Sequence, residues 1–237
     1  MHLLITSGGT IVPIDPVRSI TNTSTGKFAS ELAAAALKAG MEVTYLTSRD
    51  GKSPFSVVVD FYQSANWQDH TDNLEMLYQF SNTYRFAYKE HRYHNFAEYT
   101  ESLQKIILSK QPEIIMLAAA VSDYLVCNYS DNKIRSSENF HIQLESAPKI
   151  IHSVREWSKT SFLVGFKLLV DVEDVELVRA ADHIMRKHQL DLVIANDLSS
   201  IKRGAHEVLL VEPNGSYQKI TQNIATTVIA NIMKRVI

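Results

Sequence analysis

An apolar run, a helical pattern and a second apolar run follow one another at the start of this chain. Residues 2–6 and 41–47 have the length and composition of buried strands. Between them, leucines and alanines recur every three or four residues over 27–39, which predicts a helix, and Gly40 is typical of the position after a helix end. Strand, helix and strand in this order form a βαβ unit, which restricts the fold to those with a parallel sheet.

The alternation of strand and helix patterns continues to the C-terminus. An Asn-Gly turn between 206–211 and 217–220 predicts a β-hairpin. We therefore predict a single α/β domain over residues 1–237, with a doubly wound, mostly parallel sheet, a C-terminal β-hairpin and a closing helix at 221–236 capped by Thr221. The other expected segments are strands at 57–62, 113–119, 141–144, 162–167 and 192–195, helices at 72–80, 96–109, 150–157 and 172–188, and loops at 11–25 and 124–140.

Composition and charge exclude several classes of protein. Apolar residues make up 45% of the chain and charged residues 21%, which is ordinary for a soluble globular domain. The formal net charge of −2 predicts no nucleic-acid partner, and no apolar run is long enough to span a membrane. Cys127 is the single cysteine, so no intrachain disulfide can form and a cytoplasmic location is expected. The histidines show no metal-ligand spacing, so no protein metal cluster is predicted.

Polar residues gather where the predicted strands end, which is where ligands bind in doubly wound folds. Gly8, Gly9 and Thr10 follow the first strand, and their backbone N–H groups could form an anion nest or an ordinary turn. The third glycine of the dinucleotide fingerprint is missing. Residues 21–27 place hydroxyls, Asn22, a glycine and a lysine at a predicted helix start, which indicates either a phosphate site or a cluster of N-cap residues.

Further candidate residues follow the later strands. Ala119 and Ala120 leave room for a flat ring, or they allow a helix to pack closely. Asp123 could accept a hydrogen bond from a ribose hydroxyl, help to hold a metal ion, or serve as a helix cap. Lys133 lies in a polar loop that could close over a polyphosphate, although such a loop is more often plain solvated surface. Phe166 could stack on a base or be an ordinary core aromatic.

These segments occur together and in order, and the set resembles the phosphopantothenate–cysteine ligase family of coenzyme A biosynthesis in its monofunctional form. The resemblance implies a Rossmann-like fold, a homodimer and a reaction in two steps. The carboxylate of 4′-phosphopantothenate attacks the α-phosphate of CTP or ATP, which gives an acyl-nucleotidyl intermediate and pyrophosphate, and the amine of cysteine then displaces the nucleotide. Mg²⁺ is the implied cofactor. The matching stretches are SGGTIVPIDPVRSITNTSTGK, LAAAVSDY, NKIRSS, VGFKLLVD and DLVIANDLS, which span residues 7–199.

The resemblance also assigns roles to individual residues. Asn22 matches the asparagine that handles the acyl intermediate, and Lys133 matches the loop lysine of the activation step, so these two are the expected catalytic residues. The expected nucleotide-binding residues are Gly8, Gly9, Thr10, Ala119, Ala120, Asp123 and Phe166.

The chain departs from the bacterial pattern in two places. Bifunctional bacterial members carry a Lys-x-Lys-Lys loop and prefer CTP, whereas residues 133–137 read Lys-Ile-Arg-Ser-Ser and look more like the eukaryotic branch, which uses ATP. The base therefore stays open between CTP and ATP. The aromatic stretch 82–95 also differs from the short bacterial form, and we expect a flap or a dimer element there.

Two other functions compete with the ligase. The first βαβ unit suits a nicotinamide-dependent oxidoreductase, but the glycine fingerprint is incomplete and Arg49 stands at the tip of the second strand, where a ribose-binding acid is expected. A non-catalytic nucleotide-binding relative is the second alternative. The presence of both Asn22 and Lys133 favours the enzyme.

Overall fold

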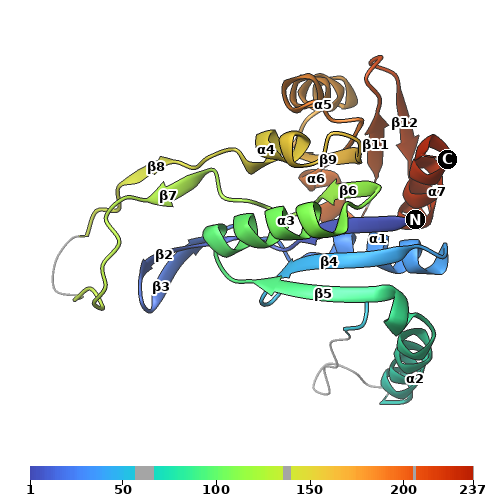
Figure 1. The fold of residues 1–237 in the computed structure, drawn as a ribbon, viewed down its shortest axis with the longest axis horizontal. Coiled ribbons are helices and arrows are strands. Elements are labelled where there is room, and N and C mark those ends of the chain that lie inside the picture. Colours follow the sequence, from blue (N-terminus) through green and yellow to red (C-terminus); the bar gives the residue numbers. More distant parts are fainter. Residues whose placement is uncertain (57–66, 136–139, 205–206, 237) are drawn as a thin grey trace.

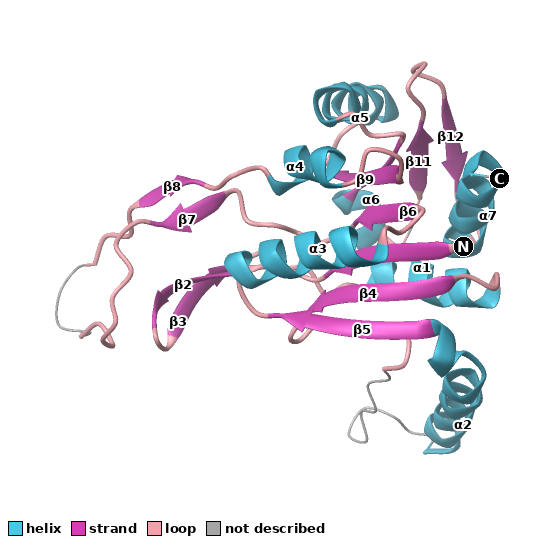
Figure 2. Ribbon diagram, viewed as in Figure 1, coloured by secondary structure: helices cyan, strands magenta, loops and turns pink. Residues whose placement is uncertain are grey.

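The computed structural model describes residues 1–56, 67–135, 140–204 and 207–236, and an eight-stranded sheet forms its centre (Figures 1 and 2). Across the sheet the strand order is β12-β11-β10-β9-β6-β1-β4-β5. The strands are β1 (His2–Ser7), β4 (Glu42–Ser48), β5 (Tyr88–Tyr93), β6 (Ile114–Leu117), β9 (Phe162–Leu169), β10 (Leu192–Asp197), β11 (Val208–Val211) and β12 (Tyr217–Ile220).

Strands β5, β4, β1, β6, β9 and β10 are parallel to one another, and the antiparallel hairpin of β11 and β12 completes the sheet through antiparallel pairing of β11 with β10. Numbered along the chain, the parallel strands lie in the order 3-2-1-4-5-6, which is that of a doubly wound Rossmann-type sheet. This confirms the predicted fold class. The order of the strands reverses between β1 and β6, and in such sheets ligands bind at that point, outside the carboxyl ends of the strands.

Helices cover both faces of the sheet. Because successive side chains of a strand point to opposite faces, Leu3 and Ile5 of β1 enter one hydrophobic core while Leu4 enters the other. All three are fully buried. The first core lies under α1 (Lys27–Lys38) and α7 (Ile224–Val236), and the second under α3 (Phe96–Lys110), α4 (Ile150–Trp157) and α5 (Asp174–His188). The helices predicted at 27–39, 96–109, 150–157 and 172–188 are thereby confirmed.

Two antiparallel ribbons project together from one end of the sheet (Figure 1). One pairs β2 (Ile11–Asp15) with β3 (Arg18–Thr21), and the other pairs β7 (Tyr124–Val126) with β8 (Leu144–Ser146). The loop predicted over 11–25 was therefore wrong, because a two-residue connection folds that segment back on itself as a hairpin. The loop predicted over 124–140 also begins with a strand, and the strand predicted at 141–144 lies a few residues later.

The segment 82–95, expected to be a flap or dimer element, forms one edge of the sheet. It contains the end of α2 (Trp67–Tyr84), a short 3₁₀ turn (Arg85–Ala87) and the edge strand β5. Charged side chains in β5 conceal the strand pattern, as is common at sheet edges. The helix predicted at 72–80 is confirmed as part of α2, whereas the strand predicted at 57–62 lies outside the described residues.

The closing helix α7 begins at Ile224 rather than at residue 221 as predicted, so Thr221 is not its N-cap. The backbone of Asn223 is left-handed, with φ of 47°, and it separates the threonine from the helix. A five-residue helix, α6 (Leu198–Lys202), follows β10. Among the described helices, none combines the length and apolar character needed to cross a membrane.

Candidate active site

The segments after β1 and β6 are joined by backbone hydrogen bonds. The N–H of Ala120 donates to the carbonyl oxygen of Gly8 at 2.8 Å, and the N–H of Thr10 donates to the carbonyl oxygen of Ala120 at 3.2 Å. The buried hydroxyl of Thr10 accepts the N–H of Ser122 at 2.8 Å. Beside them, the N–H of Ala119 donates to the hydroxyl of Thr6 at 3.1 Å. The two predicted segments therefore continue the pairing of β1 and β6 beyond the strands.

Asn22 joins this arrangement from the end of the β2–β3 ribbon. Its side-chain Nδ2 donates to the carbonyl oxygen of Ala120 at 3.0 Å, which fixes the orientation of the amide because a carbonyl can only accept. The backbone of Asn22 also lies over Gly9, where an added Cβ would come within 2.5 Å of the Asn22 carbonyl oxygen. The structure thus brings together Gly8, Gly9, Thr10, Asn22, Ala119 and Ala120, and we call these six residues the turn cluster.

The glycines of the turn cluster are required by close contacts within the chain. Gly8 has a φ of 78°, and a Cβ there would overlap the side chain of Ser48 at the end of β4. Gly9 lies against Asn22 as described above. The sequence left an anion nest and an ordinary turn open for these glycines, and the structure adds close contacts that require them before any ligand is present.

The start of α1 lacks a conventional cap. Gly26 holds the N-cap position with φ of 71° and has no side chain to accept a hydrogen bond, and no acidic residue lies in the first turn. The Thr25 hydroxyl accepts the N–H of Lys27, at a long 3.4 Å. The hydroxyls of 21–25 therefore do not form an ordinary N-cap cluster for α1.

Asp123 and Phe166 lie at the border of this region. The carboxylate of Asp123 is exposed and forms an ion pair with the exposed ammonium group of Lys149, just before α4. Phe166 of β9 packs edge-on against Phe28 in the first turn of α1, with ring centroids 6.2 Å apart. Phe166 is therefore partly a core aromatic, as the alternative interpretation held, and it also lies beside the uncapped end of α1.

Lys133 is not brought to the turn cluster. It is exposed in the loop that follows β7, one residue before a contact with the turn between β2 and β3. Its neighbour Ile134 is held there by two groups of the β2–β3 ribbon: the carboxylate of Asp15 accepts the Ile134 N–H at 3.2 Å, and Arg18 Nη2 donates to the Ile134 carbonyl oxygen at 3.0 Å. We call residues 130–135 the lysine loop.

Asp15 is a structural residue that sequence reasoning noted but gave no role. Its side chain is buried, and one carboxylate oxygen accepts the N–H groups of Val17 at 2.9 Å and Arg18 at 2.8 Å, which closes the turn between β2 and β3. Burial acts to raise the pKa of Asp15, but the N–H donors of Val17, Ile134 and Arg18 and the Arg18 charge outweigh it, so the pKa lies below its ordinary value. The available signal was the Asp-Pro-x-Arg pattern, which is typical of a turn closed by a carboxylate.

Asp15→Asn is expected to destabilise the ribbons and release the lysine loop, because an amide replaces a carboxylate that accepts three N–H donors. Since the folded-state pKa of Asp15 is lowered, its charge contributes stability fully above about pH 4 and loses it as the pH falls through the folded-state value. The difference in Tm between wild type and variant should therefore shrink from pH 7 to pH 3. A difference that stays constant over this range would show that the carboxylate charge does not hold the turn.

Within the described residues, no group of three or more His, Cys, Asp or Glu side chains is arranged to hold a metal ion. Asp123 is the carboxylate nearest in sequence to the turn cluster, and its exposure leaves it accessible. This donor set suits a Mg²⁺ ion carried mainly by substrate phosphates and water, which needs one or two carboxylates rather than a protein cage.

The doubly wound sheet and the polar cluster at its switch point define the class: an α/β protein that binds its ligand outside the carboxyl ends of parallel strands. A family model described as the DNA/pantothenate metabolism flavoprotein C-terminal domain matches residues 1–72 and 94–237. The chain belongs to this family. The match omits residues 73–93, which contain most of α2 and all of β5.

Curated relatives share this sequence over most of its length. A coenzyme A biosynthesis bifunctional protein CoaBC from Thermococcus kodakarensis is 33% identical over 210 residues, which cover 89% of this chain and 44% of that protein. Phosphopantothenate–cysteine ligase 2 from Oryza sativa subsp. japonica is 30% identical, over 89% of this chain and 71% of that protein. The chain thus spans less than half the length of the bifunctional relative and most of the plant ligase.

Solved structures show the same fold. The crystal structure of the DNA/pantothenate metabolism flavoprotein from Streptococcus pneumoniae has a TM-score of 0.77 at 28% identity and covers 100% of this chain and 98% of that one. A Cab2 mutant in complex with phosphopantothenate-cysteine has a TM-score of 0.83 over 99% of this chain and 86% of that one. At 22% identity, the second comparison supports the fold alone.

Proposed function

We propose that this chain is a phosphopantothenate–cysteine ligase of coenzyme A biosynthesis. The observation that carries the proposal is the turn cluster, in which the segments matching the ligase family meet at the switch point of the sheet. The names of the rice and Thermococcus relatives point to the same pathway. We further propose that residues 1–237 act as a single ligase domain.

The proposed reaction has two steps. A carboxylate oxygen of 4′-phosphopantothenate forms a bond to the α-phosphorus of CTP or ATP, and the bond to the β-phosphate breaks, so that pyrophosphate leaves. The cysteine amine then attacks the acyl carbon, the bond from that carbon to the nucleotide oxygen breaks, and the amine proton is lost. In this scheme the turn cluster and the first turn of α1 bind the nucleotide phosphates. Asp123 would help to hold Mg²⁺, which would supply positive charge to the phosphates when bound.

Asn22 suits a role in handling the acyl intermediate. One amide hydrogen is used by the Ala120 carbonyl, so Oδ1 and the second amide hydrogen remain to meet an acyl-nucleotide at the exposed side of the cluster. Phe166, beside the first turn of α1, is the aromatic surface for the base in this proposal. The lysine loop brings Lys133 to the phosphates when it closes.

We propose a homodimer as the working assembly, built on the ribbons. The side chains of Val17, Tyr124, Ile142 and Leu144 are apolar and exposed there, which is uncommon for large residues on an unpartnered extension. Light scattering should give the mass of two chains for the wild type. The double variant Ile142→Lys, Leu144→Lys should give the mass of one, and an unchanged mass would place the interface elsewhere.

Pyrophosphate release tests the proposed function directly. The purified protein is incubated with Mg²⁺, 4′-phosphopantothenate and cysteine, with CTP and ATP in separate reactions. Release that depends on phosphopantothenate establishes the reaction class, and the faster nucleotide identifies the base. No release with either nucleotide from a folded protein would contradict the ligase and favour a non-catalytic relative, while a rise in NADH or NADPH fluorescence on titration with the protein would favour the oxidoreductase.

Asn22→Asp is expected to separate the two half-reactions. The carboxylate of Asp would face the Ala120 carbonyl oxygen without a hydrogen to donate, and it would carry a charge beside the acyl-nucleotide. We expect pyrophosphate release to remain measurable while amide formation falls by about tenfold or more. The two steps can be followed in single-turnover reactions with and without cysteine. An equal loss in both would assign Asn22 to general substrate binding.

A further inference from the structure

Two buried tyrosine hydroxyls converge on Ser7, the last residue of β1 before the turn cluster. Tyr93 of β5 donates its hydroxyl hydrogen to the carbonyl oxygen of Ser7 at 2.7 Å. The hydroxyl oxygen of Tyr45 of β4 lies 2.8 Å from Ser7 Oγ. Ser7 and Tyr45 are fully buried and Tyr93 is almost so. The strands that carry the two tyrosines are neighbours in the sheet, but Tyr45 belongs to the core under α1 and Tyr93 to the core under α3, so the contacts reach Ser7 from opposite faces of the sheet.

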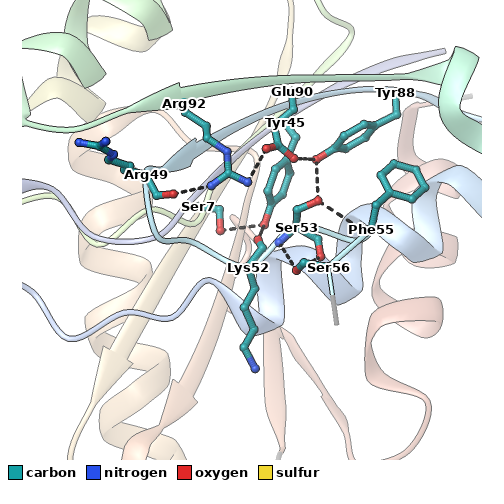
Figure 3. A network of polar contacts seen from close by, with 10 residues as sticks. All are labelled: Ser7, Tyr45, Arg49, Lys52, Ser53, Phe55, Ser56, Tyr88, Glu90 and Arg92. Atoms are coloured by element: carbon teal, nitrogen blue, oxygen red, sulfur yellow. Dashed lines mark hydrogen bonds and ion pairs between the residues drawn. The ribbon is translucent and has the colours of Figure 1, made fainter. Parts of the chain in front are cut away.

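Tyr45 also connects Ser7 to the start of α1. Its hydroxyl lies 2.9 Å from the carbonyl oxygen of Lys52, in the loop that follows β4 (Figure 3). The N–H of Lys52 in turn donates to the carbonyl oxygen of Thr25 at 3.0 Å, next to the N-cap of α1. The N-cap Gly26 lies directly against Ser7, since a Cβ there would come within 2.3 Å of Ser7 Oγ.

Side chains of β5 fix the loop after β4 as well. The guanidinium group of Arg92 forms an ion pair with Glu90 at 2.6 Å and donates to the carbonyl oxygen of Arg49, the first residue of that loop (Figure 3). The hydroxyl of Tyr88 donates to Glu90 at 2.6 Å. A backbone hydrogen bond also joins this loop to β5, because the N–H of Arg49 donates to the carbonyl oxygen of Tyr93 at 2.8 Å.

Several of these contacts come from β5, which lies outside the part of the chain that the family model matches. Strand β5 lies within residues 73–93, which the family model does not match, yet it contacts Ser7, the residue directly before the turn cluster. A phenylalanine could fill the core space of either tyrosine, so packing alone does not explain why these residues carry hydroxyl groups. Both are directed at the same residue, at the point where β1 ends and the proposed nucleotide site begins.

We infer that Tyr93 is a positioning residue for the nucleotide site, which sets the turn cluster through the Ser7 carbonyl, and that Tyr45 supports it through the Ser7 hydroxyl and Lys52. The inference rests on the proposed function. It deepens that function by extending the site to a segment outside the family match. Burial raises the pKa of both tyrosines far above neutrality, so each hydroxyl keeps its proton over the whole working pH range.

Tyr93→Phe tests this inference because it removes one oxygen atom and keeps the ring. We expect KM for the nucleotide to rise about tenfold, with kcat changed less than about twofold, since the lost bond leaves the Ser7 carbonyl free to shift. Amide hydrogen exchange of residues 8–10 should also become about tenfold faster. This second measurement needs no turnover, so it decides the inference even if the wild type proves inactive and the proposed function fails.

Arg155→Lys is the matched control for a general loss of stability. Arg155 of α4 lies at the amino ends of β9 and β10, away from the turn cluster at the carboxyl ends, and there it donates to the carbonyl oxygens of Gln189 and Ser161 and pairs with Asp191. This variant should lower Tm without changing KM or exchange at residues 8–10. Should Tyr93→Phe behave like Arg155→Lys in both measurements, the inference is overturned. If Tyr93→Phe does not fold, Tyr45→Phe replaces it, with the same pair of outcomes.

Discussion

Lys133→Ala is expected to reduce pyrophosphate release by at least about a hundredfold while the protein stays folded. In the proposed mechanism the lysine supplies positive charge to the phosphates when its loop closes, so its removal should raise the barrier of the activation step. Among the described residues, the Lys133 side chain has no hydrogen bond or ion pair, and it is exposed. Its loss should therefore change the free energy of unfolding by no more than about 0.5 kcal/mol. Initial rates and thermal denaturation measure the two effects.

Two further variants make the Lys133 experiment specific. Lys133→Arg keeps the charge and should retain part of the activity, because a guanidinium can still contact a phosphate. Lys110→Ala removes an exposed lysine at the end of α3 and should leave the rate unchanged. Near-normal turnover of Lys133→Ala would remove this residue from the activation step.

Gly9→Ala is expected to abolish activity and to destabilise the fold by about 1–3 kcal/mol. The added Cβ would lie 2.5 Å from the carbonyl oxygen of Asn22, which is a backbone atom and cannot rotate away. The turn and the end of the β2–β3 ribbon must then separate, and the hydrogen bond between Asn22 and Ala120 is lost. Activity of the folded fraction and chemical denaturation check the two parts of this prediction.

Gly40→Ala is the matched control for Gly9→Ala. Gly40 has φ of 80°, so alanine is strained there, but no atom lies within 4 Å of the added Cβ. Its cost should be about 1–2 kcal/mol, from backbone strain alone, with normal activity per folded molecule. If both variants lose stability but keep activity, the close approach of Gly9 to Asn22 has no part in the site.

The core of the fold could be predicted because its strands are apolar along their whole length. Leu3, Leu4 and Ile5 are buried on both faces of the sheet, and such strands read as continuous apolar runs. The ribbons have no such signal, since β2 contains Pro13 and β7 is three residues long. Strand β5 was missed because its sequence, YKEHRY, is that of a polar edge.

The sequence could predict the parts of the candidate site that directly follow paired parallel strands. Gly9 and Ala120 follow neighbouring parallel strands, so their meeting follows from strand order once β1 and β6 are paired. The contact of Asn22 with Ala120 depends instead on a hairpin that returns the chain to the cluster, and this hairpin was read as a loop. The position of Lys133 depends on Asp15, whose partners lie more than a hundred residues apart in the sequence.

The two ribbons are joined to each other at their outer part and to the sheet at the turn cluster. The Asp15 carboxylate accepts the N–H of Ile134, and the N–H of Ser130 donates to the carbonyl oxygen of Ile14 at 3.1 Å. The two ribbons are therefore bonded to each other. Strand β2 leaves the sheet directly after Thr10, and β7 leaves it just after Ser122. The base of the joined ribbons is therefore the turn cluster, which we propose as the nucleotide site: a ligand that tightened this base would restrain the tip, and a force on the tip would reach the ligand.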